Sequence, residues 1–239
     1  MHPLDNVIWQ ALTTRQTQFA ESCGEARRFM RDVTSLTAVL APNDAGYESL
    51  ASLVGPRGTA ALFLDDPFPG REGWSVVGGS PLLQMVCENS SAHSISHQSS
   101  SHETSDPETC AVEILPLVVE HSPEMIELTA ITKPGPFGSR THELGTYLGI
   151  WCDGKLAAMA GERLKVPGHT EVSAVCTHPD HLGKGYAGML MTEVMRRIRQ
   201  CGEIPFLHVR EDNTRAIAIY ERLGFRKRIR RHYVVVRKD

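Results

Sequence analysis

Residues 1–88 change from a helical to an extended pattern of hydrophobic positions. Apolar residues recur at helical spacing between Asn6 and Phe19, and the capping residue Asn43 opens a second short helix that reaches Leu53. The apolar runs Thr59–Leu64 and Trp74–Val77 predict two strands, because the segment between them, DDPFPGREG, is rich in turn-forming residues. The pattern therefore predicts an N-terminal α/β domain over residues 1–88.

The next segment carries almost no residues that could enter a core. Asn89–Thr109 reads NSSAHSISHQSSSHETSDPET, with eight serines and three histidines. Such a composition predicts a flexible linker or surface loop, which we place at residues 89–110. His93, His97 and His102 lack a cysteine or carboxylate partner at fixed helical spacing, so we expect no metal site.

Residues 111–239 return to regular patterns that predict a third unit. Asp153-Gly154 is a strong hairpin signal between two apolar runs. Proline at position 179 prevents a simple continuation of the strand before it. The predicted elements of this part are a strand at Ala111–Val119, a helix from Ser122 that stops before Pro134, two strands within Gly145–Leu164, and a strand at Thr170–Thr177.

A glycine-rich turn, Leu182–Gly188, then leads into an amphipathic helix. Glycines let the backbone approach a ligand closely, and the amides and positive dipole end of the new helix attract a phosphate. The turn lacks the GK[ST] ending of a Walker loop and is not a Rossmann GxGxxG. A strand at Ile204–Val209, a helix after Asn213 and a last strand at His232–Val236 complete the pattern.

Charge and composition narrow the class of protein. The 239 residues carry 25 Lys and Arg against 28 Asp and Glu, but residues 1–110 have 6 basic and 13 acidic residues, whereas residues 111–239 have 19 and 15. The basic excess is too small and dispersed to predict nucleic acid as a partner. No apolar run is long enough to cross a bilayer, and six widely spaced cysteines are typical of reduced thiols. We therefore expect a cytoplasmic protein with no membrane partner.

Two segments in this order, VCTHPDHLGKGYAGML and FLHVREDNTRAIAIYERLGF, resemble the GNAT superfamily of acyl-CoA-dependent N-acyltransferases. The resemblance covers roughly Ala111 to Asp239. It implies an α+β fold, in which a mixed central sheet with a splayed strand pair is flanked by helices and preceded here by the N-terminal α/β extension. It also implies acetyl-CoA as co-substrate, and direct attack of a primary amine on the thioester without a covalent enzyme intermediate.

By this resemblance the pyrophosphate loop falls on Leu182–Ala187. Leu182 stands where the family usually has Arg or Gln, so a side-chain contact is missing while the loop amides remain. The family's strand edge and amide positions assign the cofactor-binding residues as Val175, Thr177, Gly183, Lys184, Gly185, Tyr186, Ala187, Gly188 and Asn213.

Two residues are candidates for catalysis by the same resemblance. Tyr220 occupies the family's general-acid position, although an aromatic residue there could also simply pack on a strand. Glu171 begins the splayed strand and is the candidate base, with a strand-end or substrate-anchoring role as the alternative. Cys176 has no His and acid partners beside it in sequence, so a thiol nucleophile is not expected.

The acceptor and the role of residues 1–88 stay open at this point. The acceptor is a small-molecule or protein amine. We expect residues 124–144 to form walls of the acceptor pocket, and the acidic first half of the chain would suit a cationic acceptor. Residues 1–88 are either a degenerate GNAT-like half or a cap over the acceptor groove. A second copy of the chain, in a homodimer, is a further candidate partner. The alternative to an enzyme is a non-catalytic CoA-binding or structural module, which Leu182 slightly favours, whereas Asn213 and Tyr220 favour the enzyme.

Overall fold

The computed structural model describes residues 2–88 and 112–239, and its centre is one mixed eight-stranded sheet. All neighbouring strands are antiparallel except β9 and β10, which are parallel. The α+β class with a mixed sheet is therefore as predicted. The order is β4 (Thr59–Leu64), β11 (Arg226–Lys238), β5 (Trp74–Val86), β10 (Ile204–Arg210), β9 (His169–Thr177), β8 (Lys155–Val166), β7 (Tyr147–Cys152) and β6 (Leu115–Leu117).

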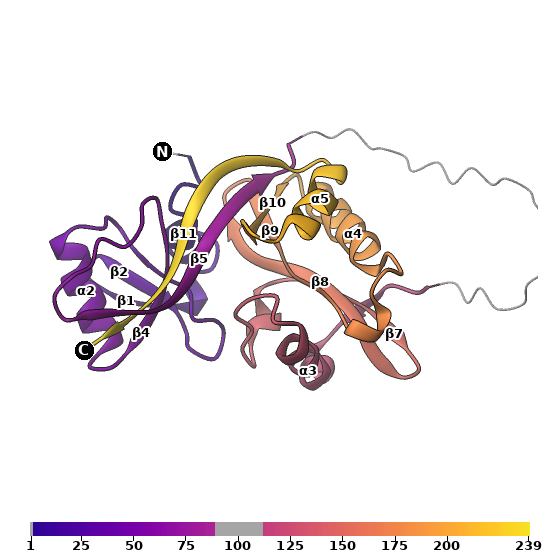
Figure 1. Ribbon diagram of the computed structural model, residues 1–239, viewed down its shortest axis with the longest axis horizontal. Coiled ribbons are helices and arrows are strands. Elements are labelled where there is room, and N and C mark those ends of the chain that lie inside the picture. The colour runs from indigo at the N-terminus through magenta and orange to yellow at the C-terminus, as the bar shows by residue number, and fades with distance from the viewer. Residues whose placement is uncertain (1, 89–111) are drawn as a thin grey trace, which may run out of the picture.

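Helices cover both faces of the sheet in the second half of the chain. α4 (Tyr186–Gln200) and α5 (Thr214–Arg222) lie on one face, and α3 (Ser122–Thr132) lies on the other (Figure 1). The apolar positions of α4, spaced three and four residues apart, bury Leu190, Val194 and Ile198 against β8 and β9. This amphipathic packing fixes the start of α4, and with it the glycine-rich turn, at the ends of the central strands.

The first half of the chain adds a small antiparallel sheet that the sequence did not predict. Helix α1 (Val7–Thr13) is shorter than expected, and α2 (Asp44–Val54) begins at the predicted cap, where the Asn43 side chain accepts a hydrogen bond from the Gly46 amide at 2.9 Å. The unpredicted strands have only three or four residues each, too few to show an alternating apolar pattern: β1 (Ala20–Cys23), β2 (Ala26–Phe29) and β3 (Thr37–Val39).

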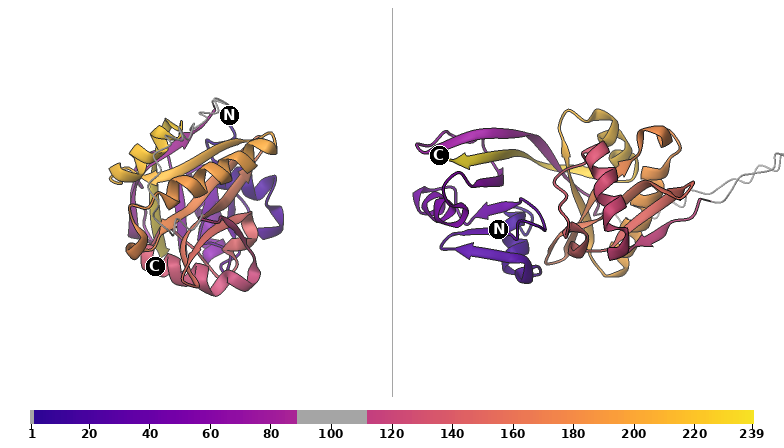
Figure 2. Two further views of the ribbon diagram at one scale, coloured as in Figure 1. Left: turned by 90° about the vertical axis from the view of Figure 1, so that its right-hand side faces the viewer. Right: turned by 90° about the horizontal axis from the view of Figure 1, so that it is seen from below.

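Two strands are much longer than predicted, and they join the halves of the molecule. β5 continues past the predicted end at Val77, and β11 begins six residues before the predicted start at His232. They pair along their whole length and form the long ribbon that crosses from the first half to the second (Figures 1 and 2). Gly79 does not break this ribbon but permits it, because an added Cβ would lie 2.4 Å from the Tyr233 carbonyl oxygen.

Backbone hydrogen bonds join the two predicted domains, residues 1–88 and 111–239. β4 and β5 come from residues 1–88, and both pair with β11. The predicted division into domains stays a prediction, and its linker, with His93, His97 and His102, lies outside the described residues. Within the described ranges, no helix is long and apolar enough to span a bilayer.

Candidate active site

The parallel strands β9 and β10 separate soon after they begin. They are paired only from Ile204 opposite His169 to Phe206 opposite Glu171, and β10 then pairs with β5 on its other side. Ala174 has φ of 52° at an irregularity of the β8–β9 ladder, so β9 bends at this point. The edge of β9 that would face β10 after Glu171 is therefore open to a ligand.

One cavity, of about 520 Å³, follows this open edge to the start of α4, and we call it the glycine groove. Lys184 and Gly188 do not line it, and the Lys184 Nζ lies 3.1 Å from His181 Nδ1. Leu182 lines it with half of its surface exposed. The other predicted cofactor residues all line the groove: Val175, Thr177, Gly183, Gly185, Tyr186, Ala187 and Asn213.

The groove ends at the start of α4 beside a run of backbone donors without acceptors, four of whose six residues line it. Among the described residues, the six amides from Gly183 to Gly188 have no hydrogen-bond partner, and the first bond of the helix runs from the Met189 amide to the Gly185 carbonyl. Gly183 and Gly185 have φ of 83° and 80°, with open space where a side chain would begin. Converging amides at a helix N-terminus suit a diphosphate, so the groove fits that part of CoA.

A second cavity, of about 620 Å³, lies on the other side of the strand opening, and we call it the central cavity. Part of its wall comes from the first half of the chain, and only residues 132–136 of the expected 124–144 wall line it. The first-half residues are Leu36, Phe63, Gly79, Ser80 and Leu82. The residues that line both cavities are Val175, Cys176, Thr177, Asn213 and Tyr220, so the cavities meet there.

Tyr220 stands at this junction with its hydroxyl unbonded to any described residue. Burial, together with the nearby Cys176 thiol, raises the pKa of Tyr220 to about 12, so the phenol keeps its proton at neutral pH. Its ring packs edge-on against Phe225. Asn213, another predicted residue at the junction, caps α5 by accepting a hydrogen bond from the Ala216 amide at 3.1 Å.

Glu171 is fully buried and lines neither cavity. Its carboxylate accepts two hydrogen bonds from Arg163, each of 2.8 Å, and lies 2.7 Å from His208 Nδ1. Burial by itself would raise the pKa of Glu171. The charge and hydrogen bonds of Arg163, together with His208, outweigh this effect and lower the pKa to about 2. This geometry favours an anchor that positions Arg163 and His208, and the role of base for Glu171 stays a prediction.

The orientation of His208 is determined by residues that no local sequence pattern singles out. The Gln84 amide oxygen accepts from Arg228 at 2.8 Å, so its nitrogen faces the Leu4 carbonyl at 3.0 Å and His208 Nε2 at 3.1 Å. His208 therefore accepts at Nε2 and donates from Nδ1 to Glu171.

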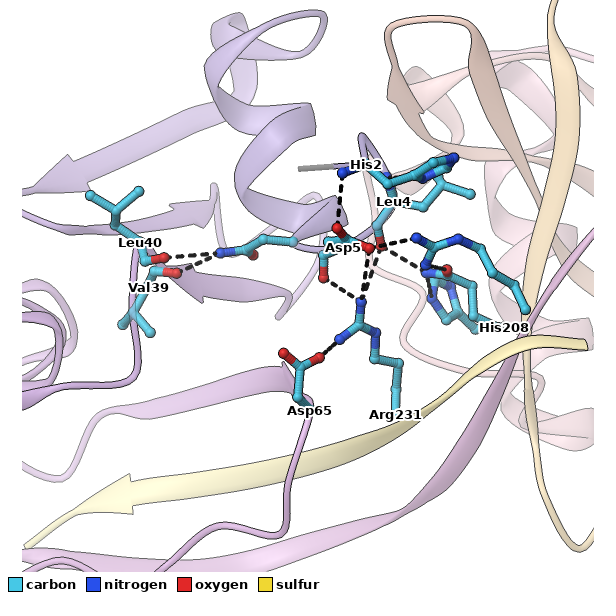
Figure 3. A network of polar contacts seen from close by, with 11 residues as sticks. His2, Leu4, Asp5, Val39, Leu40, Asp65, His208 and Arg231 are labelled. Carbon is cyan, nitrogen blue, oxygen red and sulfur yellow. Dashed lines mark hydrogen bonds and ion pairs between the residues drawn. The ribbon is translucent and has the colours of Figure 1, made fainter.

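The same network continues toward the N-terminal end of the chain. Arg231 bonds the carbonyls of Leu4 and Asp5 and pairs with Asp65 (Figure 3). Arg231 is almost fully buried, unlike the solvated strand edge that a run of arginines usually marks. The first half of the chain is thus connected to the central cavity through polar contacts as well as through its walls.

Cys176 lines both cavities, but it is buried and belongs to the hydrophobic cluster that contains Met125 and Leu128 of α3. Burial raises the pKa of its thiol to about 11, so the thiolate is scarce at neutral pH. That Cys176 is not a nucleophile stays a prediction.

The fold and the groove can be compared with known proteins. The FR47-like protein family model matches residues 147–235. A crystal structure from Novosphingobium aromaticivorans DSM 12444, assigned to the GNAT family of acetyltransferases, is 34% identical over 100% of both chains, with a TM-score of 0.85. A GCN5-related N-acetyltransferase from Kribbella flavida is 18% identical over 98% of this chain and 96% of its own, with a TM-score of 0.59. A Drosophila protein is 17% identical over 90% of this chain and 73% of its own, with a TM-score of 0.62. No curated protein matches the chain.

The splayed strand pair and the donor-rich helix start define the class as GNAT-fold proteins. At 34% identity over the full length of a GNAT relative, the chain belongs to the GNAT family of acetyltransferases. This family typically uses acetyl-CoA.

Proposed function

We propose that the protein transfers an acetyl group from acetyl-CoA to a primary amine by direct attack. The observation that carries the proposal is the run of six unpaired amides at Gly183–Gly188, in a groove that joins a second cavity at Tyr220. The amides would hold the diphosphate, and the open edge at Val175 and Thr177 would pair with the pantetheine arm. The acceptor would enter through the central cavity, so the amine and the thioester would meet beside Tyr220.

Tyr220 would serve as the donor to the leaving thiolate. Its raised pKa keeps the phenol protonated, and no described residue competes for its hydroxyl. A positioned donor of this kind stabilises charge that develops only during the reaction.

The proton of the amine needs a different path from the one expected at Glu171. No Asp or Glu is found among the described residues that line the central cavity, and Gln84 already occupies His208 Nε2. The acceptor would therefore bind as the neutral amine or lose its proton to water. We expect kcat/KM to rise with pH until the acceptor amine itself has titrated.

The test is acetyl-CoA binding by calorimetry, followed by turnover with a panel of amines. Gly185→Glu places a carboxylate and a side chain at φ of 80° in the diphosphate cradle, and we expect affinity to fall by about 100-fold or more. Gly202→Glu is the matched control, because Gly202 has φ of 75° and open space around it but lies beyond the other end of α4.

Two results would contradict the proposal. Equal loss of binding in both glycine variants would assign the effect to backbone strain instead of the cradle. Absence of acetyl-CoA binding by the wild type would mean that Leu182 marks a disabled groove, and the non-catalytic module would become the better account.

A further inference from the structure

The walls of the central cavity offer hydrogen-bond donors and no anionic acceptor. Arg163, Tyr233, Ser80 and Lys133 all line it, whereas no carboxylate does in the part of the chain that the structure describes. Such a cavity discriminates against a cationic ligand and favours one that brings its own negative charge.

Arg163 is the fixed donor of this set. Its side chain is 9% exposed, and Glu171 takes hydrogen bonds from Nε and Nη2. The remaining nitrogen, Nη1, has no hydrogen-bond partner among the described residues, and it lies 3.9 Å from the place where a Cβ on Gly135 would stand, at the cavity wall. One edge of the guanidinium is thus locked by a buried carboxylate, while the other faces the cavity.

A guanidinium held in this way is preorganised for a second carboxylate. The rotamer entropy of Arg163 has already been lost to Glu171, so a ligand would gain a charge-assisted hydrogen bond without ordering the side chain. The Tyr233 hydroxyl bonds to no described residue, and it lies close enough to Arg163 for the two side chains to interact electrostatically. Lys133 lines the same cavity, and no carboxylate of the described ranges lines it beside Lys133.

The remaining side chains of the cavity wall limit which groups a ligand can carry besides its negative charge. Leu36, Phe63 and Leu82 come from the first half of the chain, and Val209 faces them from β10. These side chains would cover an apolar group, while the junction at Tyr220 would receive the amine.

We propose that the acceptor is a primary amine that also carries a carboxylate, such as a free amino acid, with the carboxylate on Arg163. This inference rests on the proposed function. It opposes the cationic acceptor that the acidic first half had suggested, because the described residues of that half place no acidic side chain in the cavity.

The test compares each of a panel of amino acids with the amine that lacks its carboxylate, for example phenylalanine with 2-phenylethylamine, at equal concentration of neutral amine. Release of CoA thiol from acetyl-CoA gives kcat/KM, and calorimetry on the protein with and without CoA gives binding. We expect the best amino acid to exceed its partner by about tenfold or more in both measurements.

Three variants locate the effect. Arg163→Lys keeps the pairing charge for Glu171 but removes the outward nitrogen, and it should abolish the preference while CoA binding in the glycine groove reports that the protein is folded. Lys133→Ala should reduce the preference about two- to threefold at low salt. Lys155→Ala, on the β7–β8 hairpin outside the central cavity, should leave it unchanged.

Equal or better use of the amines without a carboxylate, or of spermidine, would overturn this inference and leave the acetyltransferase function standing. So would a panel in which no amino acid binds. Failure of acetyl-CoA to bind would instead overturn the function, and the calorimetric comparison would still report on Arg163.

Discussion

The glycine groove and the central cavity meet at Tyr220, yet they are built in different ways. The groove presents backbone amides from one short segment, Gly183–Gly188. The central cavity is walled by side chains from β4, β5, β8, β10 and β11, and its key arginine is held by a buried carboxylate. A backbone site tolerates changes of side chain but not of backbone conformation. A side-chain site depends on a network whose loss affects folding as well as binding.

The largest effect should come from Glu171→Gln, which breaks the buried ion pair that holds Arg163 at the wall of the central cavity. Removal of one partner of a buried ion pair costs about 3–5 kcal/mol, because the other charge is left without compensation. The free energy of unfolding, measured with urea, should fall by this amount.

The matched control for this variant is Glu193→Gln, since the pKa of Glu193 is also about 2, but its Arg196 and Arg197 partners lie on the surface of α4. We expect a loss of about 1 kcal/mol or less there. Equal losses in the two variants would remove the difference between a buried and a surface network.

The pH dependence of stability should also distinguish the wild type from Glu171→Gln. The pKa of Glu171 is lowered in the folded protein, so its contribution is complete above about 4.5 and is lost as pH falls toward about 2. Glu171→Gln should lack that part of the acid-induced loss, and a parallel pH curve in wild type and variant would contradict the assignment.

Tyr220→Phe should change the reaction without changing either binding site. We expect kcat to fall about 100-fold, with acetyl-CoA affinity nearly unchanged, because the hydroxyl is bonded to no described residue and, in the proposed reaction, would act only on the leaving group. Tyr47→Phe, at a buried hydroxyl in the first half of the chain, is the control. A fall in affinity equal to the fall in kcat would place Tyr220 in cofactor binding instead.

The smallest effect is expected from Lys184→Ala. Lys184 was predicted to bind the cofactor, but it does not line the groove and its Nζ lies beside His181. Acetyl-CoA affinity should fall about threefold or less, and only at low salt. A loss of tenfold or more by calorimetry would show that the groove depends on a side-chain charge after all.

These differences explain what could be predicted from the sequence. The α4 end of the groove is local in sequence, so the glycine-rich turn and the family resemblance together were enough to predict residues that line it. Arg163, Glu171, His208 and Gln84 lie on four strands, and only the register of the sheet brings them together. Glu171 was a candidate for catalysis because of its place at the start of the splayed strand, and nothing in its local pattern reveals that it is fully buried.

The position of β11 between β4 and β5 has a consequence for how the chain folds. β4 is an edge strand whose sole strand neighbour in the described sheet is β11, the last strand in chain order. Residues 1–88 therefore cannot complete their share of the sheet until the chain beyond α5 has been made. Such late, long-range pairing slows folding and leaves β4 open to other strands during synthesis. It also ties the unfolding of the first half to that of the second, so that the two should melt as one.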